Sequence, residues 1–373
     1  MLERVRVNLL GLPLNLEVYA GVLGVLGVGG YRDESLGLAG AVDYGPGHYT
    51  CYQFPYDWRR DIAESAASLQ AFLEEKALVV ESAYAAQGIE LSRPLKFDVV
   101  THSMGGLVAR NFLMYGSQPL PEDGSLPELT WDGAEWVERL ILVGTPNGGS
   151  ALAVRNLLDG FSLGPLQIQY PPALLGTYPS AYQLLPRNHH GAARWADSNE
   201  PVDNLFDPQL WADQGWGLMA ESQDRYLADY WSDLGDRDAR RARAGRLQAR
   251  LLRRAEQFHR AMDRPAPTPH GLEIFAVIGD KILTPSAFSI DRETGRVRVS
   301  DAEFGDGTVL RSSVLNDQRT DQGWTPHLQS PIEFAGVLFL PESHGGLTRS
   351  AIFSDNLLYW LLEDPRHGLR ARP

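Results

Sequence analysis

Residues 97–115 constrain the possible fold more than any other part of this chain. Residues that favour a buried strand, Phe97–Val100, lead into a short turn of small residues. An apolar segment with helical character follows at once and runs to about Tyr115. A turn of this kind lies at the carboxyl end of a strand and holds its side chains clear of both elements. The stretch therefore predicts a strand, a sharp turn and a helix, with the hydroxyl of Ser103 exposed at the turn.

The turn also carries a known pattern, G-x-S-x-G, with Thr101 in place of the first glycine. This pattern marks the nucleophile elbow of α/β-hydrolases when a strand precedes it and a helix follows. Threonine is small enough for the crowded position, although less free than glycine. The alternative is that Ser103 is an ordinary helix N-cap. We favour the elbow because an acid and a histidine in suitable loops follow later in the chain.

Composition excludes several classes of function. The chain has 373 residues and a formal net charge of -13, which argues against a general nucleic-acid binder. Its single cysteine, Cys51, rules out an internal disulfide. The sequence has no Cys/His cluster with zinc spacing, no P-loop and no G-x-G-x-x-G fingerprint, so we predict neither a metal nor a cofactor. No obligate protein partner is evident either.

The amino-terminal residues 7–30 are apolar and rich in glycine. Pro13, Glu17 and the glycines argue against a membrane span, and Glu17 interrupts the apolar core that a signal peptide requires. We therefore expect a buried helix with glycine loops, and a cytoplasmic protein. Secretion is the alternative if the gene start lies further upstream.

The rest of the chain alternates between strand and helix patterns on either side of a long interruption. We expect strands at 49–54, 97–101, 137–143 and 271–279, and a helix at about 61–84, which together predict a parallel, doubly wound sheet. Between 151 and 269 this rhythm stops, and a helix is expected at about 236–262. The domain prediction is accordingly a core of residues 1–150 and 270–373 with a mainly helical cap of residues 151–269.

Eight arginines fall between Arg237 and Arg254, inside the helix expected in the cap. The simpler interpretation is a solvated helix face whose charges pair with nearby carboxylates. The alternative interpretation is transient contact with an anionic lipid interface. The sequence by itself favours the first.

Candidates for the acid and the base follow the cap. Asp306 lies between two glycines in a tight loop, and Asp280 at the end of the expected strand is its rival. Hydrolase triads run serine, acid, histidine along the chain, which leaves His327, His344 and His367. His344 follows the apolar run 334–340 and precedes the final helix, so it fits the expected geometry best. His327 is the fallback, and His367 lies in a polar tail.

Five motifs in one order resemble the lecithin:cholesterol acyltransferase family of α/β-hydrolases. The resemblance extends from about Val18 to the carboxyl end and falls on Asp306 as the acid and His344 as the histidine. It departs from the family at one point: no proline-glycine loop that would donate one N–H of the oxyanion hole precedes Tyr19. The motifs are Tyr-Asp-Trp-Arg at 56–59, His-Ser-Met-Gly-Gly at 102–106, Gly-Thr-Pro-Asn-Gly-Gly-Ser at 144–150, the cap-region segment at 178–186 and Gly-Asp-Gly-Thr-Val at 305–309.

The resemblance implies a serine esterase or lipase that cleaves esters of lipid-like substrates through an acyl-Ser103 intermediate, with O-acyl transfer as a further activity. The backbone N–H of Met104 is expected to be one oxyanion donor, and the second donor is unidentified. Asp57, Trp58 and Tyr182 are expected to shape the substrate pocket. The alternatives are a non-catalytic acyl- or lipid-binding protein with an incomplete oxyanion hole, and an amidase or thioesterase on the same fold.

Overall fold

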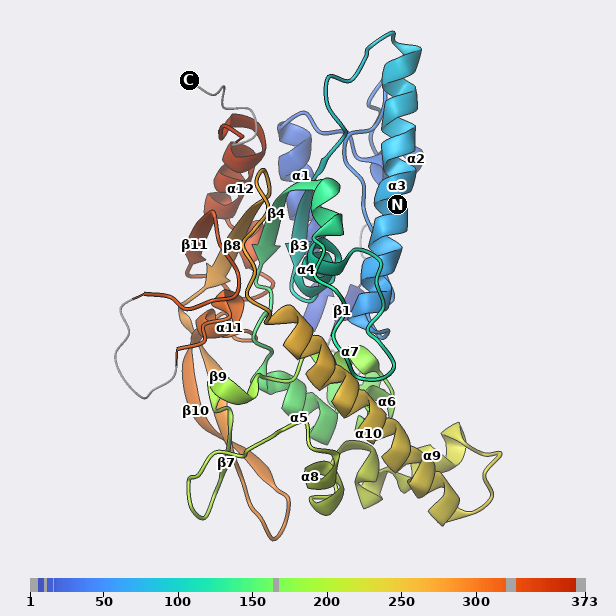
Figure 1. The fold of residues 1–373 in the computed structure, drawn as a ribbon, viewed down its shortest axis with the longest axis vertical. Coiled ribbons are helices and arrows are strands. Elements are labelled where there is room, and N and C mark those ends of the chain that lie inside the picture. The colour runs from blue at the N-terminus through green and yellow to red at the C-terminus, as the bar shows by residue number, and fades with distance from the viewer. Residues whose placement is uncertain (1–5, 10–11, 16, 164–167, 320–326, 367–373) are drawn as a thin grey trace.

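A sheet of four parallel strands forms the centre of the molecule (Figure 1). The computed structural model describes residues 6–9, 12–15, 17–163, 168–319 and 327–366. The strands lie in the order β11-β8-β4-β3, and every neighbouring pair is parallel. This arrangement confirms the predicted parallel sheet. The four strands are β3 (Phe97–His102), β4 (Val137–Val143), β8 (Glu273–Gly279) and β11 (Gly336–Leu340).

The two central strands, β4 and β8, are buried along their whole length. Each carries polar residues at its start, and Arg139 lies directly opposite Glu273 in the register of the pair. The Arg139 Nε donates to Glu273 Oε2 at 2.6 Å, and the same guanidinium donates to the carbonyl of Trp360. Buried charges of this kind are tolerated only when they are paired and hydrogen-bonded. The ion pair therefore allows Arg139 and Glu273 to be buried near the start of these two strands.

Helices cover both faces of the sheet (Figure 1). On one face, buried residues of α1 (Glu17–Val28) and α12 (Ala351–Leu358) form a cluster with strand residues such as Ile141 and Val277. On the other face lie α3 (Ile62–Ala86) and α4 (Gly105–Tyr115). The remaining elements of this part are α2 (Glu34–Leu38), η1 (Asp132–Glu135), α11 (Arg311–Leu315), η5 (Leu347–Arg349) and the π-helical η6 (Tyr359–Glu363).

The prediction of a strand at residues 49–54 is wrong. Only Cys51 of this segment takes part in β pairing, in an isolated parallel bridge with Asp33. A strand needs neighbours for its backbone groups, and no strand of the central sheet borders this segment in the described part of the chain. The aromatic and β-branched composition was therefore not sufficient to form a strand.

The amino-terminal region also differs from expectation. The expected helix is present as α1, but β1 (Arg6–Leu9) and β2 (Leu12–Asn15) form an antiparallel hairpin that was not predicted. In α1, Val22 and Leu26 are buried while Val28 is exposed, so only one side of this helix packs on the core. None of the helices within the described residues is long and apolar enough to cross a membrane.

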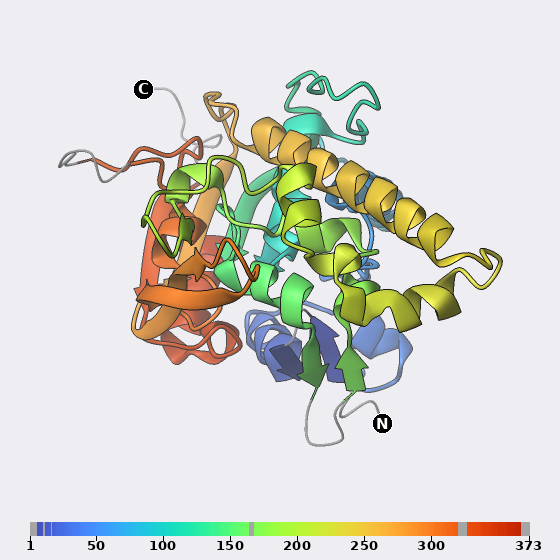
Figure 2. The same ribbon diagram turned by 90° about the horizontal axis from the view of Figure 1, so that it is seen from below.

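A largely helical layer lies between β4 and β8 in the chain and covers one end of the sheet (Figures 1 and 2). Its longest element is α10, which confirms the helix predicted at about 236–262 and buries Leu251, Ala255, Phe258 and Met262. The short strand β7 pairs with β9 of a long antiparallel hairpin, which joins this layer to the second core segment. Its helices are α5 (Ala151–Asp159), α6 (Pro172–Leu175), α7 (Pro179–Gln183), η2 (Asn188–His190), α8 (Pro208–Asp213), η3 (Gly217–Met219), η4 (Glu221–Gln223), α9 (Asp224–Tyr230) and α10 (Arg237–Met262). The strands outside the central sheet are β5 (Phe161–Leu163), β6 (Ile168–Tyr170), β7 (Ala193–Trp195), β9 (Ile282–Ile290) and β10 (Val297–Gly305).

Helix α4 approaches the loop after β4 so closely that position 106 has no room for a side chain. A Cβ on Gly106 would lie 2.0 Å from the Thr145 hydroxyl oxygen. We expect Gly106→Ala to lower the free energy of unfolding by about 1–3 kcal/mol, the usual cost of overpacking. Gly24→Ala is the matched control, because a Cβ on Gly24 of α1 would have no other atom within 4 Å, and alanine there gains about 1 kcal/mol of helix propensity. Denaturant unfolding of both variants measures the difference, and equal stabilities would contradict the close contact.

Candidate active site

Ser103 lies at the turn between β3 and α4 and has a left-handed backbone, with φ of 56°. A non-glycine residue in this region costs about 1–3 kcal/mol and is held only where the surroundings determine it. Two hydrogen bonds hold it here: the Ser103 N–H donates to the Val143 carbonyl at 2.8 Å, and the Gly106 N–H donates to the Ser103 carbonyl at 3.0 Å. This strained turn between a strand and a helix is the geometry of a nucleophile elbow.

Asp306 and His344 form a buried pair beside this turn. Asp306 Oδ2 lies 2.7 Å from His344 Nδ1, and both residues are 2% exposed. The other carboxylate oxygen accepts from the N–H groups of Thr308 and Val309, and the His344 N–H donates to the Asp306 carbonyl. These contacts fix the carboxylate and the imidazole relative to each other. The structure thus brings together two residues that lie 38 positions apart in the sequence.

Two glycines leave the space that this pair occupies. A Cβ on Gly144 would lie 3.2 Å from both His344 Nδ1 and Asp306 Oδ2, and one on Gly279 would lie 2.4 Å from Asp306 Cβ. Gly144 follows β4 and Gly279 ends β8, so both glycines lie at the carboxyl ends of central strands. The acid and the base are therefore seated directly against the sheet edge from which Ser103 projects.

His102 connects the elbow to the histidine loop, a role that the sequence did not reveal. Its Nε2 lies 2.9 Å from the His344 carbonyl oxygen, and the two imidazole rings are 4.7 Å apart. Since a carbonyl can only accept, Nε2 carries the proton and Nδ1 does not. Burial, together with repulsion from His344, lowers the pKa of His102 to about 3, so this ring is neutral at pH 7. The order of triad residues along the chain excluded His102 as the general base. Its position next to Ser103 was the one feature of the sequence that indicated a role at the site.

The hydroxyl of Ser103 and the imidazole of His344 are not hydrogen-bonded to each other in this structure. His344 Nε2 is buried, and no partner for it lies among the residues that the structure describes. Two groups next to Ser103 contact the Asp306–His344 pair. One is His102, which precedes Ser103 in the chain, and the other is Gly144, which follows the residue that accepts the Ser103 N–H. Nε2 is thus the free end of a fixed imidazole in the vicinity of the serine, which is the end that a general base uses.

The predicted oxyanion donor, Met104, lies at the amino terminus of α4. Met104 is the N-cap residue of this helix, and its backbone N–H makes no hydrogen bond within the described part of the chain. The Tyr56 hydroxyl lies 3.7 Å from where a side chain on Gly105 would begin. Tyr56 belongs to the Tyr-Asp-Trp-Arg motif, but no pattern in the sequence distinguishes it from its neighbours.

The other predicted pocket residues lie in different surroundings. Asp57 pairs with Arg59 at 2.7 Å on the surface, and Trp58 packs edge-on against the ring of Tyr178. Tyr182 is fully buried in the cap, where its hydroxyl donates to the Gly176 carbonyl. The assignment of the three residues to substrate binding remains a prediction.

The rival acid and base candidates do not join the pair. The Asp280 N–H donates to the carbonyl of Leu340, and no contact of its carboxylate with His344 is present within the described residues. His327 is exposed. His367 lies outside the described residues. Among the described residues, no group of three or more His, Cys, Asp or Glu side chains is placed to hold a metal ion.

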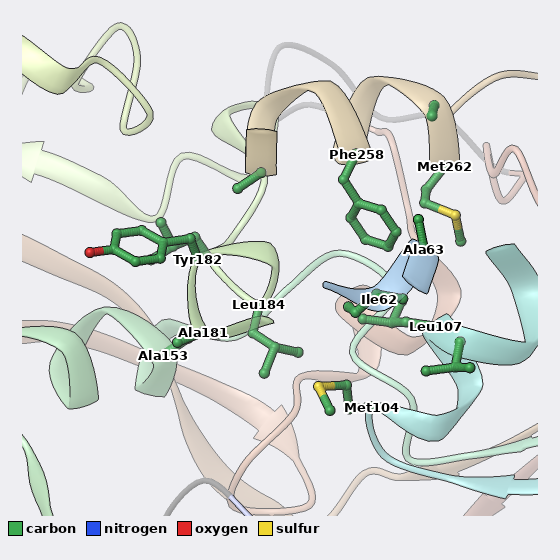
Figure 3. Close-up of a cluster of buried hydrophobic side chains, with 14 of the residues drawn as sticks. Ile62, Ala63, Met104, Leu107, Ala153, Ala181, Tyr182, Leu184, Phe258 and Met262 are labelled. Atoms are coloured by element: carbon green, nitrogen blue, oxygen red, sulfur yellow. The ribbon is translucent and has the colours of Figure 1, made fainter. Parts of the chain in front are cut away.

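The candidate site is closed in this structure. Ser103 is 6% exposed, and the side chain of Met104 packs in a buried cluster with Phe258 and Met262 of α10 (Figure 3). A cavity of about 550 Å³ lies elsewhere in the helical layer and is lined by residues such as Arg155, Tyr170 and Tyr226, not by the serine. Ser103 is thus largely buried, and the cavity in the helical layer does not reach it.

The parallel sheet, the elbow and the serine–acid–histidine order define an α/β-hydrolase fold, as the sequence predicted. A chain of the crystal structure of the Tle4–Tli4 complex shares this fold with a TM-score of 0.53 and 16% identity, covering 84% of this chain and 70% of that chain. More distant matches are the Bacillus licheniformis lipase BlEst2 in its propeptide form (TM-score 0.34, 14% identity, 84% of this chain, 43% of that chain) and lipase 1 from Pelosinus fermentans (TM-score 0.30, 12% identity, 72% of each chain).

Residues 42–209 match the family model of lecithin:cholesterol acyltransferase. This match confirms the predicted resemblance over a region that contains four of the five motifs, and the Gly-Asp-Gly-Thr-Val motif at 305–309 lies outside it. No curated relative matches the sequence. The family match supports, in general terms, an enzyme that hydrolyses lipid esters or transfers their acyl groups.

The buried, neutral His102 makes stability depend on pH. Its pKa is about 3 in the folded protein and about 6.5 in the unfolded chain, so its contribution is complete above pH 6.5 and is lost as the pH falls toward 3. We expect His102→Gln to remove about 1.4 kcal/mol per pH unit from the slope of unfolding free energy between about pH 5.5 and 4. Urea unfolding at several pH values measures both slopes. Parallel curves for the two proteins would contradict the buried neutral state.

Proposed function

We propose that the protein is a serine carboxylic-ester hydrolase that cleaves esters of lipid-like substrates through an acyl-Ser103 intermediate. One observation carries the proposal: a strained serine at the carboxyl edge of the sheet lies beside a buried Asp306–His344 pair with 2.7 Å between carboxylate and imidazole. A turn with an unfavourable backbone persists where function requires it. The family match over residues 42–209 supports a lipid ester as the substrate class.

In the proposed reaction, the hydroxyl of Ser103 attacks the ester carbonyl while His344 Nε2 takes its proton. The resulting imidazolium is stabilised by Asp306, which accepts a hydrogen bond from Nδ1 and holds the correct tautomer. Collapse of the tetrahedral intermediate breaks the bond to the alcohol, which leaves with the proton from Nε2. Water then attacks the acyl-serine by the same route and releases the carboxylic acid.

The tetrahedral intermediate needs donors that are in place before the reaction. The Met104 N–H points from the first turn of α4, where the helix dipole also favours negative charge. We assign the second donor to the Tyr56 hydroxyl, because it lies over the same helix terminus. In this assignment, a tyrosine side chain takes the place of the N–H that the proline-glycine loop donates to the oxyanion in the lecithin:cholesterol acyltransferase family.

Experiment distinguishes ester hydrolysis from three related functions. Transfer of the acyl group to an alcohol in place of water would make the protein an O-acyltransferase, and the exclusion of water by the helical layer decides between the two. The closed site favours, as the second candidate, an acyl- or lipid-binding protein without turnover. An amidase or thioesterase would use the same residues on a different acyl substrate.

Turnover of p-nitrophenyl esters of increasing chain length tests the central proposal. We expect Ser103→Ala to reduce kcat on the order of a millionfold, to background, because the nucleophile is lost. Ser68→Ala is the matched control on the exposed side of α3 and is expected to retain wild-type activity. Equal background in wild type and Ser103→Ala, with both folded, would sink the esterase proposal and favour the binding protein.

Removal of one hydroxyl tests the second oxyanion donor. We expect Tyr56→Phe to lower kcat by about a hundredfold to a thousandfold with little change in KM, the usual effect of losing one such donor. Tyr52→Phe is the control, because it removes a hydroxyl of the same segment that donates to the Tyr49 carbonyl. An unchanged kcat in Tyr56→Phe would overturn the assignment of Tyr56 and leave the serine mechanism intact.

A further inference from the structure

The outward side of α10 carries a row of arginines that the catalytic proposal does not use. Residues 244, 248, 251, 255, 258 and 262 face inward, and the positions three and four apart on the opposite side face solvent except at Gln257, which is buried under the loop of residues 121–125. From Arg246 to Arg260 the row covers about 21 Å at 1.5 Å per residue. We call it the arginine row, and it consists of Arg243, Arg246, Arg250, Arg253 and Arg260, all exposed.

The structure separates these cations from the paired arginines of the same helix. Arg237 and Arg241 both pair with Asp224, and Arg254 pairs with Asp61 at 2.6 Å. These three are therefore structural contacts between α10 and its neighbours. The sequence could not distinguish them from the others.

The arginine row itself is almost free of counter-charges. In the described part of the chain, Arg246, Arg250, Arg253 and Arg260 make no ion pair, and Arg243 has one distant partner, Asp233, at 3.6 Å. The one carboxylate of α10 between these positions, Glu256, lies on the flank and accepts from Asn204. From neighbouring elements, the charges that approach are Glu122 and Asp123, in the loop that Gln257 holds through the Pro121 and Ser125 carbonyls.

Aromatic side chains lie at one end of the row. The Arg243 guanidinium lies 5.2 Å from the centre of the Trp231 ring, and the neighbouring Tyr230 is 39% exposed. Tryptophan and tyrosine beside arginine are typical of surfaces that meet lipid headgroups, because their rings are amphipathic. Between the arginines, the outward positions Ala242 and Ala249 offer no large apolar group for insertion.

We propose that the arginine row docks the protein on the surface of an anionic lipid bilayer. Charge complementarity selects this partner: a chain with a net charge of -13 keeps an unpaired cationic row on one helix. A bilayer is favoured over a nucleic acid because the inward side of the same helix, through Phe258 and Met262, belongs to the buried cluster that also contains Met104 of the candidate site (Figure 3). Docking here presents the layer that closes Ser103 to the phase that holds lipid esters.

The contact is electrostatic, since the outward face has charge and no apolar wedge. Binding is therefore expected on bilayers that contain anionic lipid and not on purely zwitterionic ones. It is also expected to weaken between about 0.1 M and 0.5 M salt, where screening shortens to a few ångströms. The choice of a lipid bilayer as the partner rests on the proposed function at Ser103, whereas binding to the surface needs no chemistry at that residue.

Vesicle co-sedimentation of the full chain tests the proposal. All proteins carry Ser103→Ala so that lipid is not consumed. The vesicles are phosphatidylcholine alone or phosphatidylcholine mixed with phosphatidylglycerol. Each arginine near an anionic surface contributes about fivefold in partitioning, so we expect the triple variant R246Q/R250Q/R253Q to partition on the order of a hundredfold less onto the mixed vesicles.

The control variant R296Q/R298Q/R311Q removes the same number of positive charges from exposed arginines in or next to β10 and α11. We expect it to bind the mixed vesicles as the parent does. R246K/R250K/R253K is expected to retain binding, and circular dichroism checks that each variant is folded. Absence of binding to the mixed vesicles, equal losses in the two glutamine variants, or displacement of the protein from vesicles by duplex DNA would each overturn the proposal. Esterase activity plays no part in these measurements, so they are separate from the test of Ser103.

Discussion

The left-handed backbone of Ser103 is the constraint on which the candidate site depends. It is sustained by the hydrogen bond from its N–H to the end of β4 and by the contact of Gly106 with the loop after that strand. Because the strands are parallel, the loops after β4 and β8 reach the same edge of the sheet. Asp306 and His344 can then settle against Gly144 and Gly279 with no side chain in the way. Local strain at one residue is in this way held by the packing of the whole sheet.

One attachment of the helical layer to the core lies at the carboxyl end of α10. There Arg110 and Tyr115 of α4 donate to the carbonyls of Met262 and Ala261, and within the layer Arg187 forms a bidentate pair with Asp263. Burial alone would raise the pKa of Asp263, but Arg187 and the other donors more than offset it and lower the pKa to about 2. This end of α10 is therefore fixed by buried polar contacts, whereas its amino-terminal half is held mainly to other parts of the helical layer.

The two sides of helix α10 have different roles. Its inward side closes the cluster beside Met104, and its outward side carries unpaired cations. The proposed ester hydrolysis and the proposed docking surface meet at this helix, although each has its own evidence.

The sequence by itself predicted the strand–turn–helix around Ser103, the strands at 137–143 and 271–279 and the long helix at about 236–262, all of which the structure contains within a few residues. These features depend on local pattern and on residue order, which a single sequence contains. It could not determine the loss of the strand at 49–54, the contact of His102 with the His344 carbonyl, the position of Tyr56, or which arginines of α10 are paired. Each of these depends on neighbours distant in the chain, and backbone pairing, burial and charge compensation are properties of those neighbours. Only the tertiary structure brings them together.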